Sequence, residues 1–321
     1  MALVDLPLDQ LKAYKPEKNK EKDFDGFWQD KIKYLRSEPV EYNMERIDYI
    51  VPEIDACKVI YKGYKNAPIC GHYITPKNAS NSHLPVILIF HGYTGNKGPI
   101  SLNVRWPLMG YAVFAVDVRG QSGESIDNRY YSGPSSAGYM TKGIFSKDDY
   151  YYLGVYLDAI RAIDFLADRE ELDMKRLCVT GISQGGGLSL AVAGLDNRPK
   201  LVISEIPYLC HFRRAVEWAE EAKNITYLEI ANLIREYPER EDEMFKTLSY
   251  FDNLNLCGNI SAKTIISCAL KDIICPPSTI FAVYNHIESE KNIEFLPYSG
   301  HDFNTINWFD EKKLEYIKKN L

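Results

Sequence analysis

Short, largely apolar segments that alternate with helix-like segments constrain the fold of this chain more than any other feature. A strand with one face in water alternates apolar and polar residues, whereas a strand covered on both faces reads as a nearly continuous apolar run. The second pattern occurs in the segments PVILIF, AVFAVDV, RLCVTG, LVISEI and TIISCAL. Because helical patterns separate these segments, the sequence predicts an α/β fold with a mostly parallel central sheet and helices on both of its faces.

The length of the chain suits a single elaborated domain. With 321 residues and 45% hydrophobic content, one α/β domain over residues 1–321 is expected. Residues 1–50 are charged and place apolar residues at helical spacing, which predicts an N-terminal helical extension. A second helical segment at about residues 211–260 is expected as an insertion before the strand TIISCAL. Ser146 is expected to open a long helix, and Phe309 the last one.

Charge and composition argue against several classes of partner. The formal net charge is -6, and acidic and basic residues are interleaved without a basic stripe, so no nucleic-acid partner is expected. The N-terminal residues do not resemble a signal peptide and no stretch approaches a membrane span, so we expect a cytoplasmic protein with no membrane partner. The seven cysteines form no Cys-x-x-Cys pair and no Cys/His cluster. We therefore expect reduced core thiols, no metal and no cofactor.

The sharpest local signal is a serine between a predicted strand and a predicted helix. Gly181-Ile182-Ser183-Gln184-Gly185 matches the G-x-S-x-G nucleophile elbow of α/β hydrolases, and it directly follows the strand RLCVTG. The two glycines are needed because the strained strand-to-helix turn leaves no room for side chains there. A tight turn without catalytic function is the alternative. The context favours Ser183 as a nucleophile.

A serine nucleophile needs a base and an acid, which in this fold follow it in the order acid then histidine. Of the six histidines, His301 alone comes shortly after a predicted strand, NIEFLPY, beyond the elbow. The acid is expected in the loop after the preceding strand, where Asp272 comes first. Asp302 is a rival, but it neighbours His301 and is poorly placed to reach that ring. Asp272 would hold the imidazole in the required tautomer.

Two backbone amides are expected to bind the oxyanion that forms during acyl transfer. One usually belongs to the residue after the nucleophile and the other to the loop after the third strand of the core, which here gives Gln184 and Tyr93. Tyr93 lies in the glycine-rich segment 91–98, which lacks the spacing of a phosphate-binding loop. The segment Arg119-Gly120-Gln121 is expected to hold loops by charge-assisted hydrogen bonds.

Several strings of residues, in the same order nearly end to end, resemble carbohydrate esterase family seven, the acetyl xylan esterases and cephalosporin C deacetylases. These strings are DLPLDQLKAY, DFDGFW, HGYTG, VDVRGQ, GISQGGGLSLA, HFRRAVEWAE, LSYFDNLN and KDIICPPSTIFAVYN. The resemblance implies an α/β-hydrolase fold with Ser183, Asp272 and His301 as the catalytic residues, and the amides of Tyr93 and Gln184 as oxyanion donors. One departure is visible, because family members usually have Glu after the catalytic histidine and this chain has Asp302.

The resemblance also implies a function. We expect a serine carboxylesterase of carbohydrate metabolism that removes acetyl groups from small esters such as acetylated xylo-oligosaccharides and cephalosporin C, needs no cofactor and forms a homo-hexamer. Two alternatives remain open. One is an α/β hydrolase of another specificity, such as a peptidase or a longer-chain esterase; the other is a non-catalytic carbohydrate-binding homologue. Phe212, Trp218 or Tyr227 of the insertion could close a small acyl pocket.

Overall fold

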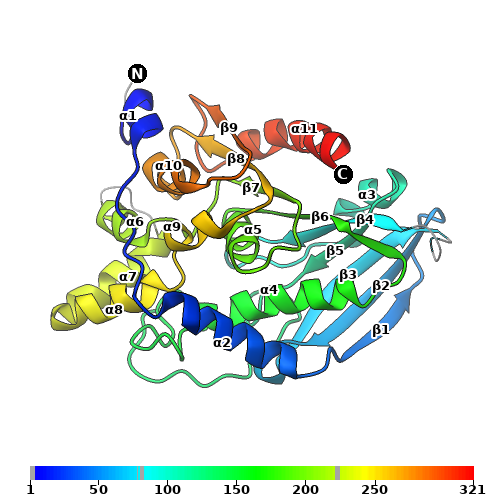
Figure 1. Ribbon diagram of the computed structural model, residues 1–321, viewed down its shortest axis with the longest axis horizontal. Coiled ribbons are helices and arrows are strands. Elements are labelled where there is room, and N and C mark those ends of the chain that lie inside the picture. The colour runs from blue at the N-terminus through cyan, green and yellow to red at the C-terminus, as the bar shows by residue number, and fades with distance from the viewer. Residues whose placement is uncertain (1–3, 78, 80–82, 221–224) are drawn as a thin grey trace.

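A nine-stranded sheet forms the centre of the computed structural model, which describes residues 4–77, 79, 83–220 and 225–321 (Figure 1). Its strands lie in the spatial order β1-β2-β3-β5-β4-β6-β7-β8-β9. Their bounds are β1 Tyr42–Ile47, β2 Ile54–Lys62, β3 Pro68–Pro76, β4 Leu84–Phe90, β5 Ala112–Val116, β6 Leu172–Ile182, β7 Leu201–Glu205, β8 Lys263–Ala269 and β9 Lys291–Leu296.

The sheet is mostly parallel, as the apolar segments predict. Antiparallel pairing joins β1 to β2, β2 to β3 and β3 to β5, whereas every pairing from β5 and β4 through to β8 and β9 is parallel. The carboxyl ends of β4, β6, β7 and β8 therefore meet at one edge of the sheet. In open α/β sheets this edge is where ligands bind.

Helices cover both faces of the sheet. Their bounds are α1 Leu8–Ala13, α2 Phe24–Ser37, α3 Arg105–Leu108, α4 Tyr151–Ala167, α5 Gln184–Leu195, α6 Phe212–Ala219, α7 Ile225–Glu236, α8 Glu241–Ser249, α9 Asn253–Leu256, α10 Pro277–His286 and α11 Phe303–Asn320. Helices α2, α4 and α5 pack on the face that buries Val86 and Leu88, while α3 and α11 pack on the face that buries Ile87. Alternate residues of β4 thus belong to two cores, which explains its continuous apolar sequence.

Residues 1–50 were predicted to be a helical extension, but the last part of this segment forms a strand. Helices α1 and α2 lie there, but residues 42–47 form β1, which pairs with β2 at the edge of the sheet. Its sequence, YNMERI, exposes or half-exposes every residue. A short edge strand of this kind carries too little apolar periodicity to be recognised without its partner.

Two predicted helix starts are also wrong. Residues 147–149 form a turn and α4 begins at Tyr151. The carboxylate of Asp149 accepts hydrogen bonds from the backbone N–H and hydroxyl of Ser132 (2.7 and 2.6 Å), outside the helix. Helix α11 begins at Phe303 instead of Phe309. The first turn of this helix is rich in polar residues, so the apolar residues at helical spacing become recognisable only from about Phe309 onwards.

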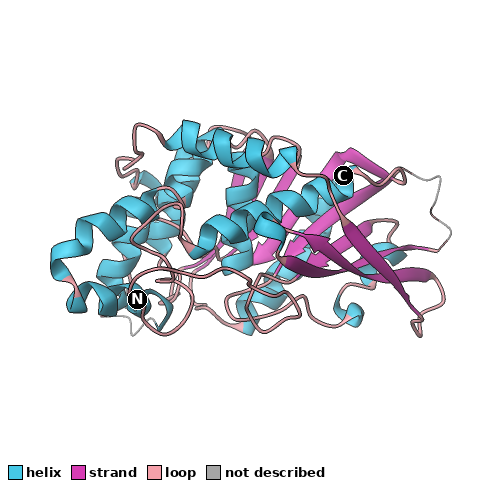
Figure 2. Cartoon of the chain, turned by 90° about the horizontal axis from the view of Figure 1, so that it is seen from below, coloured by secondary structure: helices cyan, strands magenta, loops and turns pink. Residues whose placement is uncertain are grey.

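The insertion between β7 and β8 consists of α6, α7, α8 and α9, in the predicted range (Figure 1, left). Figure 2 shows the helices gathered towards one end of the molecule while the strands extend towards the other. His211 starts the insertion in a left-handed conformation with φ 47°, and its Nδ1 accepts a hydrogen bond from the backbone N–H of Arg214 (3.2 Å). His211 is therefore the N-cap of α6.

Acid is expected to weaken this cap. Burial lowers the pKa of His211 to about 4. The neutral His211 therefore stabilises the folded state fully above the ordinary pKa of about 6.5, and this contribution is lost as the pH falls from about 6.5 towards 4. At pH 5 the loss is about 2 kcal/mol. Asparagine tolerates a left-handed N-cap and does not titrate. Urea unfolding at pH 7 and pH 5 should show a smaller drop for His211→Asn than for the parent, and equal drops would contradict the assignment.

Candidate active site

Ser183 occupies the sharp turn between β6 and α5. Its backbone has φ 54° and ψ -114°, a conformation that costs energy and is typical of functional turns. The backbone around it is fixed: the N–H of Ser183 donates to the carbonyl of Glu205 (2.8 Å), and its carbonyl accepts from the N–H groups of Gly187 and Tyr208 (2.9 Å each). The sequence therefore places a serine on a strained elbow at the carboxyl edge of the sheet, as predicted.

The glycines of the elbow lie where a side chain has no space. A Cβ on Gly181 would lie 2.4 Å from the carbonyl oxygen of Phe90, and one on Gly185 would lie 2.0 Å from the same oxygen. Both contacts are with backbone, which cannot rotate away. The elbow is thus packed directly against the end of β4, the strand that leads into the segment 91–98 that contains Tyr93.

This packing predicts a large effect of one added methyl group. Gly185→Ala is expected to destabilise the fold by about 3 kcal/mol or more and to lower any activity at Ser183, because the end of β4 and the elbow must move apart. Gly26→Ala is the matched control, since a Cβ on this glycine of α2 meets nothing within 4 Å and alanine favours a helix. Denaturant unfolding of both variants checks this. A Gly185→Ala protein as stable as Gly26→Ala would contradict the packing argument.

Asp272 and His301 form a hydrogen-bonded pair at the same edge. The Nδ1 of His301, after β9, lies 2.7 Å from Oδ2 of Asp272, after β8. The other carboxylate oxygen of Asp272 accepts the backbone N–H groups of Ile274 and Cys275 (2.8 Å each), and the residue is fully buried. Because a carboxylate only accepts, Nδ1 of His301 carries a proton, and in a neutral imidazole Nε2 is then the acceptor.

The rival acid does not take this place. The carboxylate of Asp302 accepts the backbone N–H of Gly300 (3.1 Å), within its own turn. His301 is paired with Asp272, as the sequence argument preferred.

The fully buried thiol of Cys275 lies beside this pair. Its sulfur, a carboxylate oxygen of Asp272 and a ring nitrogen of His301 all lie within 4.8 Å of one another. Burial raises the pKa of the Cys275 thiol well above its usual value, and a hydrogen bond with the Ser183 side chain acts in the opposite direction. The structure thus gathers Asp272, Cys275 and His301, with the side chain of Ser183 close to the same thiol. No local sequence pattern distinguishes Cys275 from the other buried cysteines.

Both predicted oxyanion donors lie beside the elbow, and one side chain connects them. Gln184 is the first residue of α5, so its backbone amide is among the free N–H groups of the helix terminus. The side chains of Gln121 and Gln184 form two reciprocal amide hydrogen bonds (2.9 and 3.1 Å), and Oε1 of Gln121 also accepts the backbone N–H of Thr94 (2.8 Å). Gln121 therefore fixes the loop of Tyr93 relative to α5.

Arg119 fixes the segment 119–121, which contains Gln121, to the rest of the fold. Its guanidinium is fully buried and donates two hydrogen bonds to Asp158 (2.6 Å each) and one to the carbonyl of Tyr64 (3.0 Å). A bidentate pair of this kind has fixed geometry. The predicted structural function of the Arg119-Gly120-Gln121 segment is confirmed.

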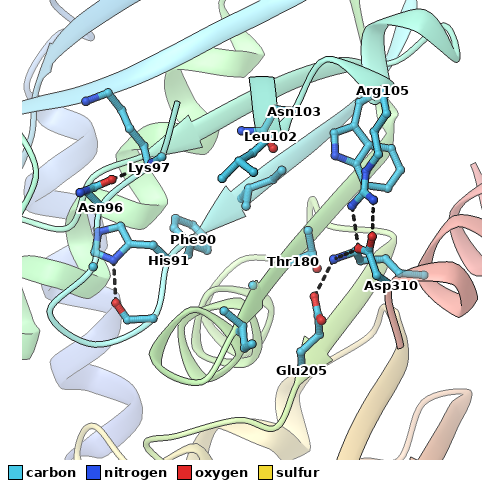
Figure 3. Close-up of a pocket in the computed structure, with 18 of the residues that line it drawn as sticks. Phe90, His91, Asn96, Lys97, Leu102, Asn103, Arg105, Thr180, Glu205 and Asp310 are labelled. Carbon is cyan, nitrogen blue, oxygen red and sulfur yellow. Dashed lines mark hydrogen bonds and ion pairs between the residues drawn. The ribbon is translucent and has the colours of Figure 1, made fainter. Parts of the chain in front are cut away.

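A cavity of about 520 Å³ lies beside the segment 91–98, on the face of the sheet covered by α11 (Figure 3). Gly92, Tyr93 and Ile182 line it on the side of the elbow. A chain of charges lines the other side: Arg105 donates to Asp310 (2.7 Å), Asp310 pairs with Lys313 (3.1 Å), and Lys313 donates to Glu205 (2.7 Å). The volume is in the range of small-molecule sites, but Ser183, Asp272 and His301 are not among the described residues that line this cavity.

The aromatic residue that reaches the elbow was not among those expected from the sequence. Phe212 and Tyr227 are buried in the core, and Arg214 stacks over Trp218. Tyr208 instead lies next to Ser183 by its backbone hydrogen bond, and its ring packs between Tyr227 (4.3 Å between centroids) and Tyr93 (6.0 Å). Tyr227 packs against Tyr208, which lies beside the elbow.

Within the described residues, two groups of side chains are close enough to share a metal ion. They are Asp272, Cys275 and His301, and Cys70, Asp117 and Glu124. In the first group the oxygens of Asp272 already accept three protein hydrogen bonds. In the second, Lys97 lies 2.8 Å from both carboxylates. Protein donors thus already occupy the oxygens of both groups. Across the described part of the chain, each helix is too short or too polar to cross a bilayer.

The comparison with protein families decides the family. The sequence model of the acetyl xylan esterase (AXE1) family matches residues 1–320. The chain belongs to the acetyl xylan esterase family. The resemblance identified from the sequence is therefore confirmed.

Solved structures of acetyl xylan esterases support the assignment of this chain to the family. It is similar to the solved acetyl xylan esterase from Paenibacillus sp. R4, with 42% identity, a TM-score of 0.93, and coverage of 98% of this chain and 100% of that one. It is also similar to acetyl xylan esterase 1 from Thermoanaerobacterium sp. JW/SL YS485, with 32% identity, a TM-score of 0.91 and coverage of 98% of each chain.

A curated relative is longer than this chain. The acetyl esterase Axe7A of Xylanibacter ruminicola is 29% identical over 301 residues, which are 89% of this chain and 65% of that protein. The fold itself is shared more widely. The α/β hydrolase GrgF from Penicillium sp. sh18 matches with a TM-score of 0.56 at 16% identity, over 88% of this chain and 99% of its own. The predicted α/β-hydrolase fold is confirmed.

Proposed function

We propose that this chain is a serine carboxylesterase that hydrolyses acetyl esters of small substrates through an acyl-enzyme intermediate. The observation that carries the proposal is the 2.7 Å hydrogen bond between His301 and Asp272 beside a serine on a strained elbow. Membership of the acetyl xylan esterase family and the acetyl esterase names of its relatives support the acetyl preference.

In the first step the Oγ of Ser183 attacks the carbonyl carbon of the ester while Nε2 of His301 takes the hydroxyl proton. Asp272 stabilises the imidazolium that forms, and the backbone amides of Tyr93 and Gln184 bind the oxyanion. The bond between the carbonyl carbon and the alcohol oxygen then breaks, and His301 gives its proton to the leaving alcohol. The result is an acetylated Ser183.

In the second step water attacks the acyl-enzyme. His301 takes a proton from the water, the oxyanion forms in the same place, and the bond to Ser183 breaks as His301 returns the proton to Oγ. Acetic acid leaves, and the enzyme is restored. No cofactor enters this proposed sequence.

Acetate release from a panel of acetylated xylo-oligosaccharides and cephalosporin C tests the substrate class. Acetyl, butyryl and octanoyl esters of one chromogenic alcohol test the acyl preference, and the acetyl ester is expected to turn over fastest. Rapid octanoyl cleavage would favour a longer-chain esterase. A protein that neither releases acetate nor reacts with a fluorophosphonate would fit a non-catalytic homologue instead.

Cytoplasmic location and a homo-hexameric assembly are part of the same proposal, and the assembly rests on the family resemblance. Light scattering after size-exclusion chromatography measures the mass in solution. Six copies of a 36.8 kDa chain are expected, and a monomer mass would contradict the assembly.

A further inference from the structure

Glu229 reaches from the helical insertion to the loop that contains the predicted oxyanion donor. It lies on α7, and its Oε1 accepts the hydroxyl hydrogen of Tyr93 (2.7 Å). Its Oε2 accepts the backbone N–H of Met140 (2.9 Å), and the backbone N–H of Tyr139 donates to the Tyr93 hydroxyl oxygen (2.8 Å). One carboxylate thus joins three segments that are far apart in the sequence.

The carboxylate of Glu229 is also in close steric contact with the loop that contains Gly138. A Cβ on Gly138, which has φ 103°, would lie 2.1 Å from Oε1 of Glu229, so the loop backbone passes directly over the carboxylate. The hydroxyl of Ser136 donates to the backbone carbonyl of Glu229 (2.9 Å). The carboxylate is therefore held in one position by the loop that it binds.

The backbone beside Tyr93 and the side chain of Tyr93 are held by different partners. On the backbone side, Gln121 accepts the N–H of the next residue, Thr94. On the side-chain side, Glu229 accepts the phenol hydrogen, and the Tyr93 ring packs between Tyr139 (5.7 Å between centroids) and Tyr208 (6.0 Å). The Tyr93 N–H belongs to the Gly92–Tyr93 peptide, whose carbonyl accepts the N–H of Gly95 (3.0 Å) and lies 2.7 Å from Nδ1 of His91. The bond to Glu229 adds an anchor on the side chain of the same residue, and an amide that turns away cannot bind an oxyanion.

Burial and hydrogen bonding act on the pKa of Glu229 in opposite directions. Burial raises the pKa of Glu229, while the hydrogen bonds from the Met140 amide and from Tyr93 favour its ionised form. Burial also raises the pKa of Tyr93, so its phenol stays a donor at neutral pH. A hydrogen bond to an ionised acceptor is shorter and stronger than one between neutral groups.

We propose that Glu229 is a positioning residue that holds Tyr93 so that the Tyr93 backbone amide points at the oxyanion. The inference rests on the proposed esterase function and deepens it, because it makes the helical insertion a part of the catalytic apparatus. Glu229 touches neither the substrate nor the reacting atoms in this scheme. It acts only through Tyr93.

Two substitutions test the inference from opposite ends of the bond. In Glu229→Gln the side-chain amide has one acceptor oxygen, so either Tyr93 or the Met140 N–H loses its partner. Tyr93→Phe keeps the ring and removes only the hydroxyl. Each variant is expected to lower kcat for p-nitrophenyl acetate about tenfold, less than the 10²–10³ lost with an entire oxyanion donor. KM should change by less than about twofold, because the oxyanion exists only in the transition state.

The double variant and a control make the test specific. Because both changes break one interaction, Glu229→Gln/Tyr93→Phe should be no slower than the slower single variant by more than about twofold. Glu236→Gln is the matched control, since Glu236 lies exposed at the end of the same helix, and it should retain the parent kcat. Circular dichroism and the endpoint of fluorophosphonate labelling give the concentration of folded, reactive protein, and all rates are expressed per labelled site.

The possible failures are distinguishable. If the parent releases no acetate, the proposed function fails. If the parent is active and Glu229→Gln keeps its kcat, or raises KM alone, or if the double variant multiplies the two single effects, then Glu229 does not position Tyr93 and the inference is overturned. If Glu229→Gln does not fold, Tyr93→Phe still decides the outcome through its kcat and KM.

Discussion

Replacing Ser183 with alanine is expected to abolish acetyl release, with a fall in kcat of about 10⁶-fold, because no other oxygen can form the acyl-enzyme at this elbow. The change removes only the hydroxyl. The backbone hydrogen bonds of residue 183 to Glu205, Gly187 and Tyr208 stay in place, so the fold and the oxyanion site should persist. A radioactive or chromogenic acetyl ester measures the residual rate, and a fluorescent fluorophosphonate measures labelling of the serine.

Ser189→Ala is the matched control for this experiment. Ser189 lies on α5, the helix that follows Ser183, and its hydroxyl donates to the carbonyl of Gly185 (2.8 Å). This variant should still be labelled and should still release acetate. If Ser183→Ala retained labelling or more than a trace of activity while folded, another residue would be the nucleophile and the proposed mechanism would be wrong.

The central site residues could be predicted from the sequence because topology determines where they meet. Ser183 follows β6, Asp272 follows β8 and His301 follows β9, and parallel strands bring their carboxyl ends to one edge. Each residue also follows an apolar strand pattern that can be recognised locally. Order along the chain and position after a strand were therefore sufficient to select Asp272 over Asp302.

The rest of the site depends on contacts that leave no local pattern. Glu229 lies 136 positions from Tyr93 and Gln121 lies 63 from Gln184, so neither pair can be recognised from spacing. Tyr208 reaches Ser183 through a backbone bond that any residue could make. The same reason explains β1, whose pairing with β2 defines it as a strand more than its own sequence does.

The second large effect is expected for Asp272→Asn, with a fall in kcat of about 10⁴-fold, because the substitution forces the wrong tautomer on His301. Two backbone N–H groups, of Ile274 and Cys275, point at Oδ1 of Asp272. In asparagine the side-chain oxygen must face these donors, so the NH₂ group must face Nδ1 of His301. Nδ1 then has to accept, the ring proton moves to Nε2, and the imidazole can no longer take the proton of Ser183.

Asp302→Asn separates this explanation from a general effect of charge near the histidine. An asparagine oxygen at position 302 can still accept the N–H of Gly300, as Asp302 does, and kcat should stay within about twofold of the parent. Rates of acetyl ester hydrolysis for the two variants, with folding checked by circular dichroism, make the comparison. Because both substitutions remove one negative charge close to His301, equal losses would mean that charge alone matters. A large loss in Asp272→Asn alone would instead show that catalysis depends on the hydrogen bond that Nδ1 of His301 donates to Asp272.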